Sequence, residues 1–102
     1  MGVKPPHKIK VGLHVYRVRV NASGGMTGSD SGVTDHHGCV VHLDTTQALS
    51  MRQDTLLHET LHAVLLPYNM DSEAEEKLIR FLAPALLTVL RENPKLTQYL
   101  LA

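Results

Sequence analysis

The sequence has no tryptophan, one phenylalanine and three tyrosines among its 102 residues. Platforms that stack nucleic-acid bases need several exposed aromatic rings, so the composition disfavours that function. Lysine plus arginine number ten, as do aspartate plus glutamate, and the formal net charge is zero. Without a basic excess, no long-range field attracts nucleic acid or an anionic membrane surface. We therefore expect neither as a partner.

Cysteine is represented by Cys39 alone, which excludes an internal disulfide. No apolar run resembles a signal peptide or is long enough to cross a bilayer. These absences fit a protein of the reducing cytoplasm. A chain of this length can form one hydrophobic core but not two, so we expect a single domain over residues 1–102. Histidine, with seven residues, is the conspicuous excess.

Two segments have the patterns of β-strands. Residues 8–20 alternate between apolar and polar side chains, with a shift of phase at Tyr16, which predicts one strand with one buried face and a bulge near Tyr16. Residues 39–44 predict a second, shorter strand. The intervening residues 21–32 are rich in Gly, Ser and Asp and predict a loop. Because sequential strands usually neighbour each other, we expect these two to pair antiparallel.

A first helix is expected over about residues 51–66, ended by Pro67. Ser50 followed three residues later by Gln53 is the signature of a capping box at its start. The helical period predicts a row of side chains that face the core, namely Leu57, Leu61 and Val64.

A second helix is expected, with Asp71 or Ser72 as its N-cap, and Asn93 and Pro94 should end it. Pro84 should kink this helix or start a new segment. The remaining residues form a short amphipathic tail. The predicted buried stripe consists of Leu78, Ile79, Leu82, Leu86, Val89 and Leu90. The fold class is therefore α+β, a small antiparallel sheet packed on a helical hairpin.

The segment LLHETLHAV, residues 56–64, carries the chemistry of the sequence. His58, Glu59 and His62 form the pattern H-E-x-x-H on the first helix, and residues four apart lie on the same face, so both imidazoles can reach one metal ion. Glu59 is poorly aligned as a ligand but well placed to contact a water bound to that ion. Structural histidines that bind no metal are the alternative.

A catalytic zinc usually has three protein ligands and a water, so a third ligand is needed. Glu73, Glu75 and Glu76 lie in the first turns of the second helix, which returns antiparallel to the first. Glu73 is in phase with basic residues and is expected to face solvent. Glu75 is placed to complete a capping box with Ser72. The axial level of the metal favours Glu76, with Glu75 as the rival and a role at the helix dipole as the other use of Glu76.

The motif and its setting resemble the gluzincin class of zinc metallopeptidases, in which a glutamate from a following helix completes H-E-x-x-H. More narrowly, residues 38–100 resemble very small H-E-x-x-H proteins encoded by phages and prophages. The gap between His62 and the acidic cluster is shorter than in large gluzincins. The resemblance implies a zinc-dependent peptidase of the host bacterial cytoplasm, acting on a peptide or protein substrate.

In that reading, Glu59 takes a proton from the zinc-bound water and passes it to the leaving amine. As in larger zincins, the strand at residues 39–44 is expected to pair with an extended peptide. Tyr68 is a candidate donor to the oxyanion, with covering of the core edge as its alternative role. Truncation after Asn93 tests whether the C-terminal tail folds back over the cleft.

Other histidines and the cysteine carry weaker hypotheses. His36 and His37 are expected to be solvated in a polar loop, and with His42 they are alternative metal ligands. Cys39 is expected to be a small buried strand residue. A removable zinc ligand or a nucleophile are its alternatives.

Two other functions remain open from the sequence. One is a non-catalytic, zinc-stabilised module that binds a host or virion protein. The other is a metal-dependent amidase acting on a non-peptide amide, such as a cell-wall cross-link. The oligomeric state is not indicated by the sequence.

Overall fold

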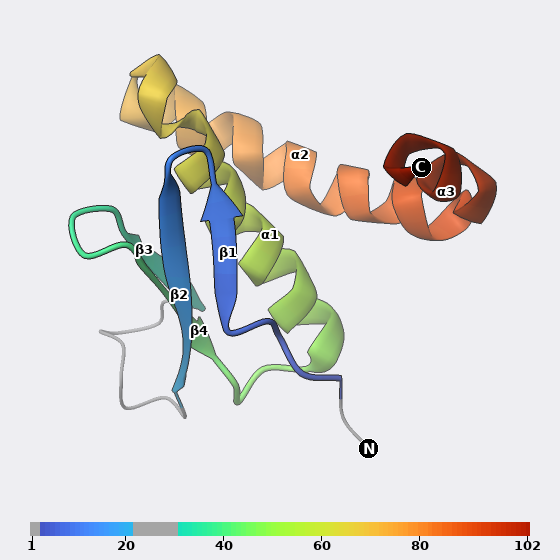
Figure 1. Ribbon diagram of the computed structural model, residues 1–102, viewed down its shortest axis with the longest axis horizontal. Helices are drawn as coiled ribbons and strands as arrows, with labels where there is room; N and C mark the ends of the chain where they lie inside the picture. The colour runs from blue at the N-terminus through green and yellow to red at the C-terminus, as the bar shows by residue number, and fades with distance from the viewer. Residues whose placement is uncertain (1–2, 22–30) are drawn as a thin grey trace.

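The computed structural model describes residues 3–21 and 31–102 (Figure 1). Most of the loop predicted for residues 21–32 lies outside the described residues. Four strands and three α-helices follow one another in the order β1 (Lys8–Val11), β2 (His14–Asn21), β3 (Gly32–Asp35), β4 (Val40–Asp44), α1 (Leu49–Leu65), α2 (Ser72–Glu92) and α3 (Pro94–Leu101), with a short 3-10 helix, η1 (Leu66–Tyr68), after α1. The predicted α+β class is confirmed.

The sheet is mixed, with strand order β1-β2-β4-β3. β1 and β2 form an antiparallel hairpin, and β3 pairs antiparallel with β4. β2 and β4 run parallel, so the predicted antiparallel pairing of the two sequence-predicted strands is wrong. The reason is the third strand, β3, which the sequence pattern did not reveal. It forms a hairpin with β4, and β4 is therefore a central strand and β3 an edge strand.

The predicted strand over residues 8–20 is two strands joined by a turn at Gly12 and Leu13. Gly12 has a φ of 58°, a left-handed conformation that glycine adopts without steric cost. Leu13 at the turn is 96% exposed, so the apolar phase that includes it does not face the core. The buried phase of β2 instead contains Tyr16 and Val18. The shift of the apolar pattern at Tyr16 is therefore the point from which the side chains of β2 that face the core are counted.

α1 packs across the sheet and contacts β1, β3 and β4 (Figure 1). The buried side chains of α1 are Thr55, Glu59 and Ala63, which lie one turn apart on one face. The predicted core-facing row is therefore wrong at Val64, which is 42% exposed. Ala63 joins Tyr16 and Val41 in the main apolar cluster of the described residues.

The start of α1 also differs from the prediction. Its N-cap is Ala48, which makes no side-chain hydrogen bond, and Ser50 lies inside the helix. Ser50 and Gln53 therefore do not form a capping box. The backbone N–H of Arg52 donates to the Ala48 carbonyl at 2.9 Å, and the helix begins at Leu49 rather than at the predicted residue 51.

α2 lies against α1 and is the second layer on the side away from the sheet (Figure 1). The Asp71 side chain accepts a hydrogen bond from the Ala74 N–H at 3.1 Å, which confirms the predicted cap. The helix continues through Pro84, so no new segment starts there. Ile79 is the fully buried member of the predicted stripe, and Ala83 is buried beside it one turn on. Three predicted stripe members are exposed: Leu78, Leu82 and Val89.

The C-terminal tail forms α3, which follows the predicted break at Asn93 and Pro94. Among the described helices and strands, α3 contacts α2 alone. It lies at the far end of α2 from the α1–α2 connection (Figure 1). The tail therefore does not fold back over α1 in this structure.

Candidate metal centre

The connection between α1 and α2 sets the level at which the two helices face each other. Pro67 lies in η1, and Asn69 follows with a φ of 50°, a left-handed conformation that turns the chain back. The N–H of Asn69 donates to the Leu66 carbonyl at 3.2 Å and closes the turn. This reversal places the start of α2 beside the last turns of α1, where His58 and His62 lie.

Three side chains converge in the seam between the two helices. Glu76 Oε1 lies 3.1 Å from His58 Nε2 and 2.9 Å from His62 Nε2. The three donor atoms all lie within 4.8 Å of one another. The ring centres of His58 and His62 are 5.0 Å apart, as their spacing of one helical turn requires. The structure thus brings together the three residues that the sequence proposes as metal ligands.

The donor set fits a zinc ion. Two neutral imidazole nitrogens and one carboxylate oxygen, with an open fourth position, form a typical catalytic zinc site. With bonds of about 2.1 Å, a tetrahedral ion would separate its ligand atoms by about 3.4 Å. The two measured separations from Glu76 Oε1 are a few tenths of an ångström shorter. A lengthening of these two separations by a few tenths of an ångström would match the spacing around the ion.

Glu75 lies next to the cluster but has a different geometry. Its Oε2 is 2.7 Å from Nδ1 of His62, the ring nitrogen that faces away from Glu76. An N–H at Nδ1 that donates to Glu75 leaves the Nε2 lone pair of His62 free for a metal, and such outer carboxylates orient metal-binding histidines. The geometry therefore favours Glu76 over Glu75 as the third ligand. Glu73 is exposed, in agreement with the prediction.

The cluster perturbs the ionisation of its members. Burial by itself disfavours the protonated ring of His62, but the hydrogen bonds to Glu75 and Glu76 outweigh it and raise the pKa of His62 above its usual 6.5. Burial raises the pKa of Glu76, but the bonds from the two histidines and from Arg80 outweigh it and lower the pKa below 4.5. Arg80 Nη2 lies 3.2 Å from Glu76 Oε2.

Glu59 lies on the sheet side of the cluster and is 8% exposed. The Thr34 hydroxyl lies 2.6 Å from Oε1 of Glu59 and 3.2 Å from its backbone oxygen. A hydrogen bond from this hydroxyl restricts the orientation of the Glu59 carboxylate. Thr34 belongs to β3, so a strand that the sequence analysis missed positions the predicted general base.

Gly32 allows β3 to approach α1 this closely. A Cβ at this position would lie 2.5 Å from Thr55 Cγ2 and 3.1 Å from Glu59 Cγ. Contacts under about 3 Å are not tolerated in close-packed protein interiors without movement of the neighbours. The absence of a side chain at residue 32 is therefore a packing requirement of the site.

Two grooves meet at this cluster, and Glu59 and Glu76 line both. The first has a volume of about 620 Å³ and continues past His58 to Asp54 and Arg80. The second has a volume of about 290 Å³ and continues past His62 along β3 to His36. The cluster is thus open to ligands on two sides, with the edge strand β3 along the smaller groove.

His36 lines the smaller groove, whereas the sequence analysis expected it to be solvated, with a role as a metal ligand as the alternative. It follows β3 directly and is half-buried rather than solvated, whereas His37 is exposed as predicted. The hydroxyl of the buried Tyr16 lies 3.0 Å from Nδ1 of His36, with the two rings in an edge-to-face arrangement. Only the position of His36 after a strand gives a sequence signal, and the strand itself was not predicted.

The other sequence candidates lie outside the cluster of three possible ligands. Tyr68 is 73% exposed in η1 and lines neither groove, so it is not placed to donate to an oxyanion. His42 lies on β4, with Nδ1 3.4 Å from the Asn21 amide. Cys39 is half-buried just before β4 and packs against the apolar cluster. The structure therefore gives neither His42 nor Cys39 a role as a ligand.

Comparisons with known proteins give no assignment. No family model, curated protein or solved structure matches the chain. In the residues that the structure describes, no helix has the length and apolar character needed to span a membrane.

Proposed function

We propose that the protein is a zinc-dependent peptidase. The observation that carries this proposal is the convergence of His58, His62 and Glu76 on one point, with the buried carboxylate of Glu59 beside it. Two nitrogens and one oxygen would leave a coordination position for water, and a zinc ion bound there would supply a water whose pKa is lowered to about 7. The protein residues then have to hold the ion, accept the water's proton and orient the substrate.

Glu59 is the group that accepts this proton and later delivers it to the leaving amine. The hydrogen bond from Thr34 to Oε1 occupies one carboxylate oxygen and leaves Oε2 for the proton. Glu75 holds a proton on Nδ1 of His62, so that Nε2 would be free to bind the ion.

β3 is the strand to which we assign substrate binding. The sequence analysis gave this role to residues 39–44, but β4 lies between β2 and β3 and has no free edge. β3 is at the edge of the sheet and lines the groove beside His62. An extended peptide that pairs with an edge strand is held by main-chain hydrogen bonds, which suits a peptide substrate of any sequence.

His36 replaces Tyr68 as the residue that we assign to the oxyanion. When the Tyr16 hydroxyl donates to Nδ1, the neutral ring of His36 carries its proton on Nε2. A donor of this kind on the groove wall suits the carbonyl oxygen of the scissile bond. His36→Ala should lower kcat about 100-fold, as removal of one oxyanion donor does, and leave zinc content unchanged. The matched control is His37→Ala, at the exposed neighbouring position.

The variant Glu59→Gln tests the proposed function. It keeps the size of the side chain and removes the base, so we expect one zinc ion per chain and a loss of peptide hydrolysis of at least about 100-fold. The assay is cleavage of a library of unstructured peptides by the zinc-loaded protein, read by mass spectrometry. A wild-type protein that binds zinc and cleaves no peptide would contradict the proposal. Peptidoglycan fragments tested in parallel distinguish a peptidase from an amidase.

The resemblance to small phage-encoded H-E-x-x-H proteins supplies the biological setting of the proposal. We assign the enzyme to the host bacterial cytoplasm and its substrates to peptides or proteins present there. The single cysteine is compatible with a reducing compartment. The test of this assignment is fractionation of infected or lysogenic cells, with the protein expected in the cytoplasmic fraction.

A further inference from the structure

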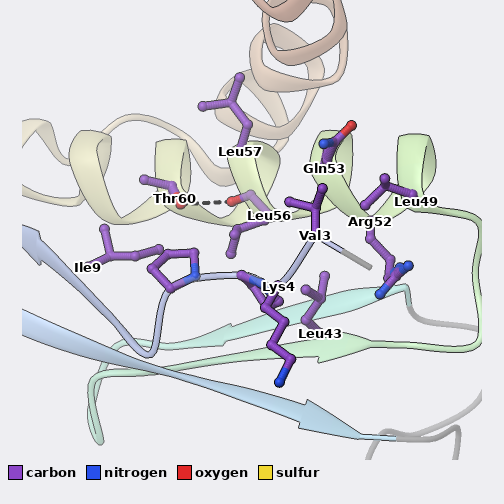
Figure 2. Close-up of a pocket in the computed structure, with 12 residues that line it drawn as sticks. Val3, Lys4, Ile9, Leu43, Leu49, Arg52, Gln53, Leu56, Leu57 and Thr60 are labelled. Carbon is purple, nitrogen blue, oxygen red and sulfur yellow. Dashed lines mark hydrogen bonds between the residues drawn. The ribbon is translucent and has the colours of Figure 1, made fainter. Parts of the chain in front are cut away.

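A second cavity lies between the N-terminal segment and the first half of α1, and it shares no lining residue with the metal grooves (Figure 2). Leu56 on its wall and His58 in the metal cluster are two residues apart, or about 200° around the helix. The cavity therefore lies on the opposite face of α1 from the metal cluster. Its volume is about 330 Å³, near the lower end of the range for small-molecule sites.

The wall of this cavity is mainly aliphatic. Ile9, Leu43 and Leu56 surround it from β1, β4 and α1 (Figure 2). Its neutral polar side chains already have partners. The Thr60 hydroxyl donates to the Leu56 carbonyl at 2.7 Å, and the Gln53 side-chain oxygen accepts from Arg91. The Thr60 hydroxyl and the Gln53 side-chain oxygen are therefore poor candidates to select a ligand.

Arg52 is the exception among the polar lining residues. Its Nε atom is buried and has no hydrogen-bond partner in the described part of the chain. Among the described residues of the wall, the other charged one is Lys4, and none is acidic. An unpartnered buried donor is costly, and a guanidinium binds a carboxylate through two parallel hydrogen bonds. The charge of the cavity is therefore complementary to an anion with an apolar body.

We propose that this cavity binds a small amphiphilic anion, an unbranched alkyl carboxylate whose head group pairs with Arg52. At about 30 Å³ for each water-sized group, the cavity has room for about eleven non-hydrogen atoms. Octanoate, with about ten, matches this volume. Its chain lies along the aliphatic wall, and its carboxylate completes the hydrogen bonding of the arginine after a small shift of the side chain.

A ligand series on the wild-type protein tests the proposal without any substitution. Isothermal titration calorimetry is carried out with octanoate, hexanoate and octan-1-ol at monomeric concentrations. We expect one octanoate per chain, and binding of hexanoate about 15-fold weaker, because each buried methylene contributes about fourfold. Octan-1-ol, which lacks the charge, should bind at least about tenfold more weakly than octanoate. Equal binding of the alcohol and the carboxylate, or uptake without saturation, would overturn the proposal.

A matched pair of variants locates the site. Arg52→Gln should weaken octanoate binding about tenfold and leave octan-1-ol binding unchanged, because only the charged head group loses its partner. Arg17→Gln is the control, since Arg17 is exposed on β2 and does not line the cavity. Circular dichroism and zinc titration check that both variants fold. Octanoate binding by Arg52→Gln at the wild-type affinity would exclude this site. If Arg52→Gln does not fold, the comparison of head groups on the wild type decides.

Discussion

The substitution Glu75→Gln separates the metal ligand from the carboxylate behind it. Glu75 accepts a hydrogen bond at 2.7 Å from Nδ1 of His62, and its side chain is 15% exposed, so the contact is largely screened from water. Loss of an outer carboxylate of this kind usually lowers metal affinity by about 10-fold to 100-fold. That range corresponds to about 1.4 to 2.8 kcal/mol. Glu76→Gln removes a ligand and should weaken zinc binding at least about tenfold more.

Competition titration against a fluorescent zinc chelator, at one pH and ionic strength, measures these affinities. Glu73→Gln is the control, because Glu73 lies in the same helical turn and is exposed. We expect its zinc affinity to remain within about twofold of the wild type. Zinc binding by Glu75→Gln at the wild-type affinity would refute the role of Glu75. A greater loss in Glu75→Gln than in Glu76→Gln would show that their roles are reversed.

Three further predictions concern pH, packing and the tail. Because the pKa of His62 is raised in the folded state, its contribution to the stability of the metal-free fold is fully present below pH 6.5 and is lost as pH rises through the folded pKa. Because the pKa of Glu76 is lowered, its contribution is fully present above pH 4.5 and is lost as pH falls through the folded pKa. Urea unfolding should therefore show their joint contribution to be greatest between these two values, and a flat profile would contradict this. Gly32→Ala should destabilise the fold by about 1 to 3 kcal/mol, and Thr55→Ser, which removes the Cγ2 atom that the new Cβ would meet, should recover part of this loss in a double-mutant cycle. Additive effects would exclude that contact as the cause. Deletion of residues 94–102 should leave zinc affinity within about twofold of the wild type, because α3 contacts α2 alone among the described elements, and a larger change would mean that the tail reaches the site.

The helices were predictable because each has a long apolar period and a clear stop signal. α1 spans Leu49–Leu65 against a predicted 51–66, and α2 ends at Glu92, before the predicted break. The sheet was less predictable. β3 has four residues, and its first and last, Gly32 and Asp35, are of types that are depleted in strands, so it gives no recognisable pattern. Because β3 was not predicted, the direction of β4 relative to β2 was also predicted wrongly.

The candidate site was predictable where it depends on spacing within one helix. His58 and His62 face one point because they are one turn apart, and a short connection fixes the level of Glu76. The parts supplied by the sheet were not predictable. Thr34 and His36 reach Glu59 and the groove only because β3 packs beside α1, a contact between residues more than twenty positions apart. Local periodicity carries no information on contacts of this range.

A crystal structure of the zinc-loaded protein, with anomalous diffraction recorded at the zinc edge, tests the metal site most directly. We expect one strong peak per chain in the seam between α1 and α2, about 2.0 to 2.2 Å from His58 Nε2, His62 Nε2 and a carboxylate oxygen of Glu76. A water on the fourth position should lie within hydrogen-bonding distance of Glu59. A seam without a peak, or an ion held by Glu75 or by residues outside this seam, would contradict the account.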